Sequence, residues 1–190
     1  MKTIHYFNSD AEANVPDDAI EKEKKLRQTL CGYARRNVAI DPNRVTCKAC
    51  KIELARKGYE LGRNLTVKEK LMNIYLNCST RKFAKVFSEY AESRNISKWD
   101  SRKKDNSNSY YAEGKDEYWD RVDCNIYLPK NEELSLHIVL RKKSYLFIVF
   151  QDETIFEYDR IEGIKTYEEE KLNKALEVHR KLFNMLLANS

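Results

Sequence analysis

Three cysteines that fit no apolar stripe constrain this chain more than any other feature of its sequence. Cys47 and Cys50 stand in the stretch VTCKAC at the expected start of a helix, and Cys31 precedes Gly32 in TLCG. The C-x2-C spacing lets two sulfurs reach one ion from a turn that runs into a helix. Gly32 permits a tight turn around Cys31, the geometry of a zinc knuckle. This pattern predicts a metal site.

The fourth ligand follows from what zinc requires. Structural zinc takes four nitrogen or sulfur ligands in a tetrahedron. His5 is the only histidine near these cysteines in the sequence, in the strand-like run TIHYF, which we expect to pair with the strand that ends at Cys31. The predicted ligands of one structural Zn2+ are therefore His5, Cys31, Cys47 and Cys50. Such a closed shell leaves no open position for catalysis.

Two alternatives stay open for these thiols. A redox C-x-x-C pair usually accompanies a βαβ pattern, and buried inert cysteines act as small apolar residues. The first 60 residues favour the metal, because they carry few large apolar side chains. A unit of that size commonly needs a metal to complete its folding.

The other two cysteines fit apolar patterns. Cys78 continues a helical stripe after Leu71, Ile74 and Tyr75, and Cys124 alternates in phase with the apolar residues around it. Both are expected in the core, because free cysteine packs as a small hydrophobic residue.

The ligand pattern resembles a small zinc-binding module of uncharacterised proteins from bacteriophages and some bacteria. The resemblance lies in a histidine on a first strand, then TLCG at 29–32, then VTCKAC at 45–50. It covers about the first 60 residues and implies no enzymatic activity.

The periodicity beyond the module predicts an α+β fold. Helices are expected from 46 to about 57, from 67 after the capping-box pattern Thr66–Glu69, and after Ser79 or Thr80 up to Asn95. Four strands at 118–128, 134–140, 145–150 and 154–158 are separated by short turns, which favours an antiparallel meander. A final helix with an apolar stripe from Leu172 to Leu187 would cover it. The expected domains are a zinc module (a β-knuckle plus a helix) at 1–62 and a helix–meander–helix domain at 63–190.

Composition and motifs argue against several classes of protein. No apolar run approaches the roughly 20 residues that span a bilayer, and the N-terminus lacks the apolar region of a signal peptide. A cytoplasmic location is therefore expected, in a host cell if a phage encodes the chain. Only five glycines and no GxGxxG or GxxxxGK[ST] motif argue against a phosphate-binding loop. His137 is expected on the outer side of the sheet and His179 inside an apolar stripe, so neither indicates a catalytic site and we expect no enzyme.

The segment 98–116 is predicted to be a loop that mixes cations with aromatic rings. Such mixtures suit single-stranded nucleic acid and also protein interfaces; packing of the rings on the helices is the third possibility. The candidate partner-binding residues are Trp99, Arg102, Lys103, Lys104, Tyr110 and Tyr111.

These expectations combine into one functional hypothesis. The chain would be a non-enzymatic, zinc-stabilised phage-type accessory protein that binds a host protein or nucleoprotein machine, and an anti-CRISPR-like inhibitor is one specific form. The alternative is a DNA- or RNA-binding regulator, which a net charge of +5 permits. No membrane partner or small-molecule substrate is expected.

Overall fold

The computed structural model of the chain describes residues 2–14, 26–59, 64–100, 102, 108–114, 120–129, 131–141 and 144–190. The fold is α+β, as predicted. The chain divides into two compact units. The first comprises Met1–Asn73 and Arg160–Gly163, and the second comprises Ile74–Asp159 and Ile164–Ser190. The boundary falls inside helix α3, Val67–Asn77, whereas the sequence predicted it at residue 62. Within the described residues, no helix combines the length and apolar character that crossing a membrane requires.

The described residues of the first unit form very short strands and one complete α-helix before α3. Its elements before α3 are β1 His5–Tyr6, η1 Ser9–Asn14, β2 Arg27–Gln28, β3 Ala34–Arg35, β4 Val38–Ala39, η2 Pro42–Arg44 and α2 Lys48–Arg56. One apolar cluster of this unit contains only four buried residues: Tyr6, Val45, Cys50 and Leu54. Two of the predicted ligands, Cys31 and Cys47, pack against that cluster. A core this small is consistent with stabilisation by a metal.

The pairing of the first strand confirms the prediction in part and adds a second partner. β1 pairs in parallel with β4, with His5 opposite Val38. The predicted partner, the strand that ends before Cys31, joins the same segment through an antiparallel bridge between Phe7 and Thr29. In this bridge the Leu30 amide donates to the Tyr6 carbonyl, and the Asn8 amide donates to the Gln28 carbonyl. That partner also pairs antiparallel with β3 as a small hairpin. Strands of two residues carry too little pattern to specify a partner.

The second unit contains a seven-stranded sheet, in the order β11-β10-β9-β8-β7-β6-β5. The four predicted strands are present as β7 Arg121–Tyr127, β8 Leu136–Arg141, β9 Tyr145–Phe150 and β10 Glu153–Asp159, each antiparallel to its sequence neighbour. The remaining strands, β5 Ser97–Lys98, β6 Ser109–Gly114 and β11 Gly163–Tyr167, were not predicted. The prediction of a loop over 98–116 is therefore wrong at Lys98 and over Ser109–Gly114, while 103–107 and 115–116 lie outside the described residues. β6 pairs antiparallel with β7 along its whole length.

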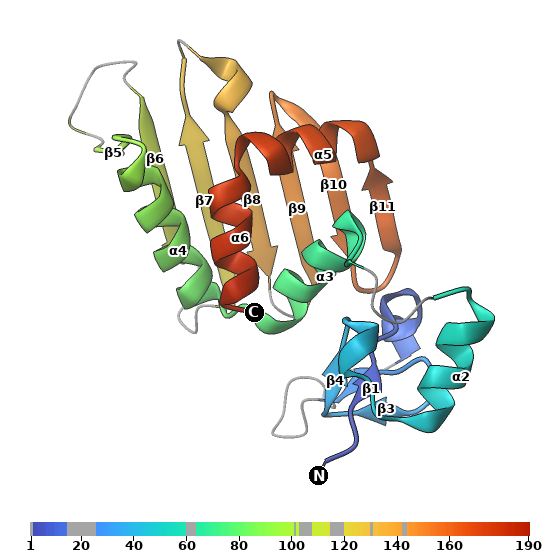
Figure 1. Ribbon diagram of the computed structural model, residues 1–190. Coiled ribbons are helices and arrows are strands. Elements are labelled where there is room, and N and C mark those ends of the chain that lie inside the picture. The colour runs from blue at the N-terminus through green and yellow to red at the C-terminus, as the bar shows by residue number, and fades with distance from the viewer. Residues whose placement is uncertain are drawn as a thin grey trace. The chain divides into compact units, whose positions relative to one another are not determined.

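Helices α4 Thr80–Ser93, α5 Glu169–Val178 and α6 Arg180–Ala188 lie on one face of this sheet (Figure 1). Ser79 is the N-cap of α4: its hydroxyl accepts from the Lys82 amide at 3.3 Å. Asn95 follows the end of the helix at φ +58°. α3 begins with the predicted capping box: the Glu69 amide donates to Thr66 Oγ1, and the Thr66 amide donates to Glu69 Oε2. The single predicted final helix is interrupted at His179, which separates α5 from α6.

The core of the second unit lies between these helices and the sheet. Alternate strand residues face it, among them Val122, Cys124, Ile138, Leu140 and Ile148, all buried. Cys78 and Cys124 are fully buried, which confirms that both are core residues. His179 is also buried, as its place in the apolar stripe predicted.

Candidate metal centre

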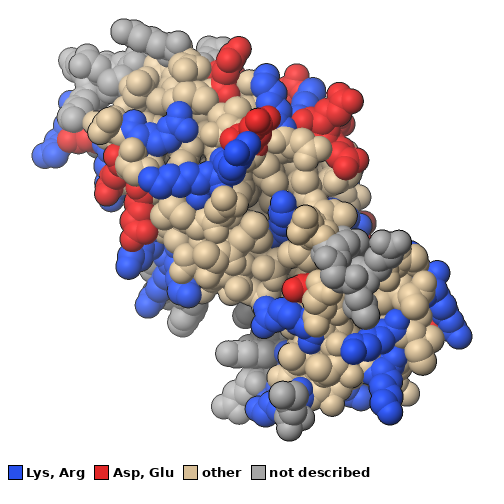
Figure 2. All heavy atoms as spheres, viewed as in Figure 1, with Lys and Arg blue, Asp and Glu red and all other residues tan. Residues whose placement is uncertain are grey.

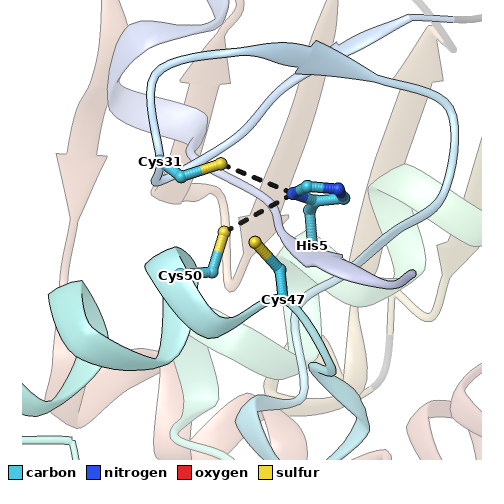
Figure 3. Close-up of side chains that lie close together, drawn as sticks. All are labelled: His5, Cys31, Cys47 and Cys50. Atoms are coloured by element: carbon cyan, nitrogen blue, oxygen red, sulfur yellow. Dashed lines mark hydrogen bonds between the residues drawn. The ribbon is translucent and has the colours of Figure 1, made fainter.

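Three separate segments of the first unit bring the four predicted ligands together. His5 comes from β1, Cys31 from the turn after β2, Cys47 from the N-cap of α2 and Cys50 from its first turn. Their ligand atoms all lie within 4.8 Å of one another. Figure 3 shows the three sulfurs and the His5 ring pointing toward a common centre.

Local hydrogen bonds explain why Cys31 faces this centre. Gly32, at φ +86°, closes a turn in which its amide donates to the Thr29 carbonyl at 3.0 Å. The Thr29 hydroxyl lies 3.2 Å from the Cys31 sulfur. Positive φ is available to glycine at little cost, so the TLCG stretch turns immediately after the ligand.

The backbone of Ile4 aligns β1 with the start of α2. Its carbonyl accepts from the amides of both Thr46 and Cys47 at 2.9 Å, and its amide donates to the Thr46 hydroxyl at 2.8 Å. His5, the next residue, is therefore held beside the C-x2-C segment. This link brings the histidine to Cys47 and Cys50, and the bridge between Phe7 and Thr29 brings the segment of Cys31 beside it.

The spacing of the donors fits a tetrahedral ion. Nδ1 of His5 lies 3.4 Å from Sγ of Cys31 and 3.8 Å from Sγ of Cys50. Usual bond lengths of about 2.3 Å to sulfur and about 2.0 Å to nitrogen would separate two such ligand atoms by about 3.5 Å around zinc. The donor set of three thiols and one imidazole is also one that zinc prefers. Nδ1 is the ring nitrogen that faces the sulfurs.

The electrostatics of the site also suit a cation. Burial and then the charge of Arg35 lower the pKa of His5, which keeps its imidazole neutral and able to act as a ligand. Burial raises the pKa of Cys31, but hydrogen bonds, the largest of them with the Thr29 side chain, outweigh burial and leave the pKa below its usual value. Burial raises the pKa of Cys50 to about 12. A thiolate at that position at neutral pH would need a cation beside it.

The predicted contact segment divides in the structure. Trp99 is 56% exposed, and Arg102 is exposed and paired with Asp100 at 3.0 Å. Tyr110 does not fit a contact surface, because its ring is only 2% exposed and its hydroxyl donates to Glu92 at 2.7 Å. Of these three candidates, only Trp99 and Arg102 are therefore accessible to a partner.

Tyr111 is partly buried on β6, where its hydroxyl donates to Asp123. Lys103 and Lys104 lie outside the described residues. The tyrosine pair thus alternates across a strand: Tyr110 faces the helices and Tyr111 the opposite face. Because a loop was predicted for this segment, the two tyrosines were not assigned to opposite faces of a strand.

The structure also assembles a polar cluster that was not predicted from the sequence. Asp123, on the sheet face away from the helices, accepts from His137 Nε2 at 2.8 Å and from the Tyr111 hydroxyl at 3.1 Å. Arg121 lies 3.6 Å from its other oxygen. The one available signal was a polar Asp123 between the apolar Val122 and Cys124. The residues that bond to Asp123 come from neighbouring strands, and the register between those strands cannot be predicted from the local sequence pattern.

A scan against protein-family models, a search of curated proteins and a search of solved structures each return no match to this chain.

Proposed function

We propose that the first unit holds one structural Zn2+ through His5, Cys31, Cys47 and Cys50, and that the chain is a non-enzymatic protein which binds a macromolecule. The observation that carries the zinc assignment is the convergence of these four donors within 4.8 Å from three segments. Four protein ligands of this kind complete a tetrahedral shell.

Several features support a structural over a redox role for the thiols. A redox pair needs only Cys47 and Cys50, whereas here a third thiol and an imidazole share the same centre. The adjoining core is small, so an ion that links β1, the β2–β3 turn and α2 would contribute folding free energy to the unit. A shell without an open position gives a substrate or a reactive water no place on the ion.

Metal analysis of the purified chain tests the zinc assignment. We expect one zinc per chain for wild type and a clear loss for Cys47→Ala. The matched control is Cys78→Ala, which removes a thiol from the other unit and should leave the zinc content at one per chain. Metal below stoichiometry that is unaffected by Cys47→Ala would refute the assignment.

The macromolecular role is supported by the closed metal shell and by the exposed basic and aromatic side chains of the chain. Affinity capture from a lysate, with and without nuclease, distinguishes a protein partner from a nucleic-acid one. The expectation of a phage accessory protein that inhibits a host machine derives from the sequence resemblance alone and stays a prediction.

A further inference from the structure

The positive charge of the chain is concentrated around the candidate metal centre. Residues 26–59 contain eight Lys or Arg residues and two Asp or Glu residues, a net formal charge of +6, whereas the whole chain carries +5. The rest of the chain is therefore close to neutral. All of these cations except Arg27 are exposed. The eight are Arg27, Arg35, Arg36, Arg44, Lys48, Lys51, Arg56 and Lys57.

The two carboxylates of this segment do little to neutralise it. Asp41 accepts from the Asn43 backbone amide at 2.9 Å as the N-cap of η2, and Glu53 pairs with Arg56 at 2.6 Å. Figure 2 shows the consequence: Lys and Arg side chains spread over this unit with few Asp or Glu side chains among them.

The metal ligands bring two basic segments to one place. Arg35 and Arg36 follow Cys31 within a few residues, and Lys48 and Lys51 flank Cys50. Because the ligand sulfurs lie within 4.8 Å of each other, both segments leave the centre from neighbouring points. Two separate basic stretches of sequence, each with two exposed cations, are thus anchored at one centre.

An exposed aromatic ring lies beside one of these cations, Arg35. Tyr33 is 62% exposed, one of the most exposed large hydrophobic residues among those described. The guanidinium carbon of Arg35 lies 5.0 Å from the centroid of its ring, a cation–π distance. An exposed ring beside cations offers a face on which an unpaired base can stack while the cations bind phosphates.

We propose that Tyr33, Arg35, Arg36, Lys48 and Lys51, named here the knuckle surface, bind single-stranded nucleic acid. The proposal deepens the proposed function and depends on it, because the metal holds the two basic segments together. The charge selects a polyanion. The exposed Tyr33 selects a strand with unstacked bases over a duplex, whose base faces are hidden.

The test measures binding of the full zinc-loaded chain to a fluorescent 20-nucleotide single strand by anisotropy across a salt series. The quadruple variant R35Q/R36Q/K48Q/K51Q should weaken binding at least tenfold in low salt. It should also reduce the slope of log affinity against log salt by about 0.7 for each phosphate that the variant no longer neutralises. The matched control R81Q/K82Q/K174Q/R180Q removes two Arg and two Lys from exposed positions of the other unit. It should leave affinity and slope near wild type.

The stacking role has its own pair of variants. Tyr33→Ala should weaken single-strand binding about 5- to 100-fold, whereas Tyr33→Phe, which keeps the ring, should retain it. An abasic strand of the same length should bind wild type and Tyr33→Ala equally.

Four results would overturn the proposal: no single-strand binding at low salt, equal weakening by the control quadruple, tighter binding of a 20-base-pair duplex, or equally tight binding of anionic phospholipid vesicles. Zinc content is measured on every sample. Full zinc without strand binding rejects the knuckle surface alone, whereas a chain that binds no zinc rejects the proposed function.

Discussion

Asp123 and His137 lie on adjacent strands of the sheet and are joined by a hydrogen bond of 2.8 Å between Oδ1 and Nε2. Asp123 is only 3% exposed, and the Tyr111 hydroxyl donates to the same oxygen. One carboxylate therefore connects β6, β7 and β8 on the face opposite the helices. A buried carboxylate is costly unless donors surround it, so breaking these hydrogen bonds should destabilise the sheet.

We expect Asp123→Ala to destabilise the second unit by about 1–3 kcal/mol, because it leaves the partly buried donors of Tyr111 and His137 without their acceptor. Tyr111→Phe, which removes one donor and keeps the ring, should cost about 0.5–1.5 kcal/mol. Urea unfolding followed by circular dichroism measures both. Equal and negligible effects would show that the cluster adds nothing to stability.

His179 should make the second unit sensitive to acid. Burial and then the charge of Arg94 lower its pKa to about 4, while Tyr90 lies 2.8 Å from its Nδ1. The unfolded chain takes up this proton near pH 6.5, but the folded chain resists it until about pH 4. This group therefore leaves the unfolding free energy unchanged above pH 6.5 and lowers it as the pH falls, by roughly 3 kcal/mol at pH 4.

Comparison with His179→Gln isolates this contribution, because acid effects elsewhere in the chain are common to both proteins. We expect the difference in unfolding free energy between wild type and variant to change across pH 6.5 to 4. A difference that stays constant over that window would contradict a depressed pKa at His179.

Chelation should separate the two units. The second unit has its own core between helices and sheet, whereas the apolar cluster beside the candidate metal centre is small. With excess EDTA, hydrogen exchange should become fast across α2 and the β2–β3 turn and stay slow in β7, β8 and β9. Simultaneous loss of protection in both units would mean that they fold as one.

Truncation to alanine should affect the melting temperature much less at Trp99 than at Tyr110. Trp99 is exposed, so Trp99→Ala should leave the melting temperature nearly unchanged. Tyr110→Ala should lower the melting temperature clearly, because the loss of a buried ring costs about 3–5 kcal/mol of unfolding free energy. Thermal unfolding measures both, and a comparable drop for the two would contradict the difference in burial.

The sequence by itself determined the features that depend on short spacings. The capping box at Thr66 and Glu69, the cap at Ser79, the alternation of Val122 with Cys124 and the helical stripes all involve residues within four positions of each other. The candidate ligands could be predicted from the sequence for a similar reason, because zinc chemistry restricts the donor types and the C-x2-C spacing is local.

Only the tertiary structure decided which distant residues meet. It placed Tyr110 in the core and Tyr111 on Asp123, paired β1 with β4, and gathered the segments of Arg35 and Lys48 around one centre. A local pattern states which face of a strand is apolar, but not which strand lies beside it or in what register. Those choices depend on the free energy of packing the whole chain, and no short stretch of sequence contains that information.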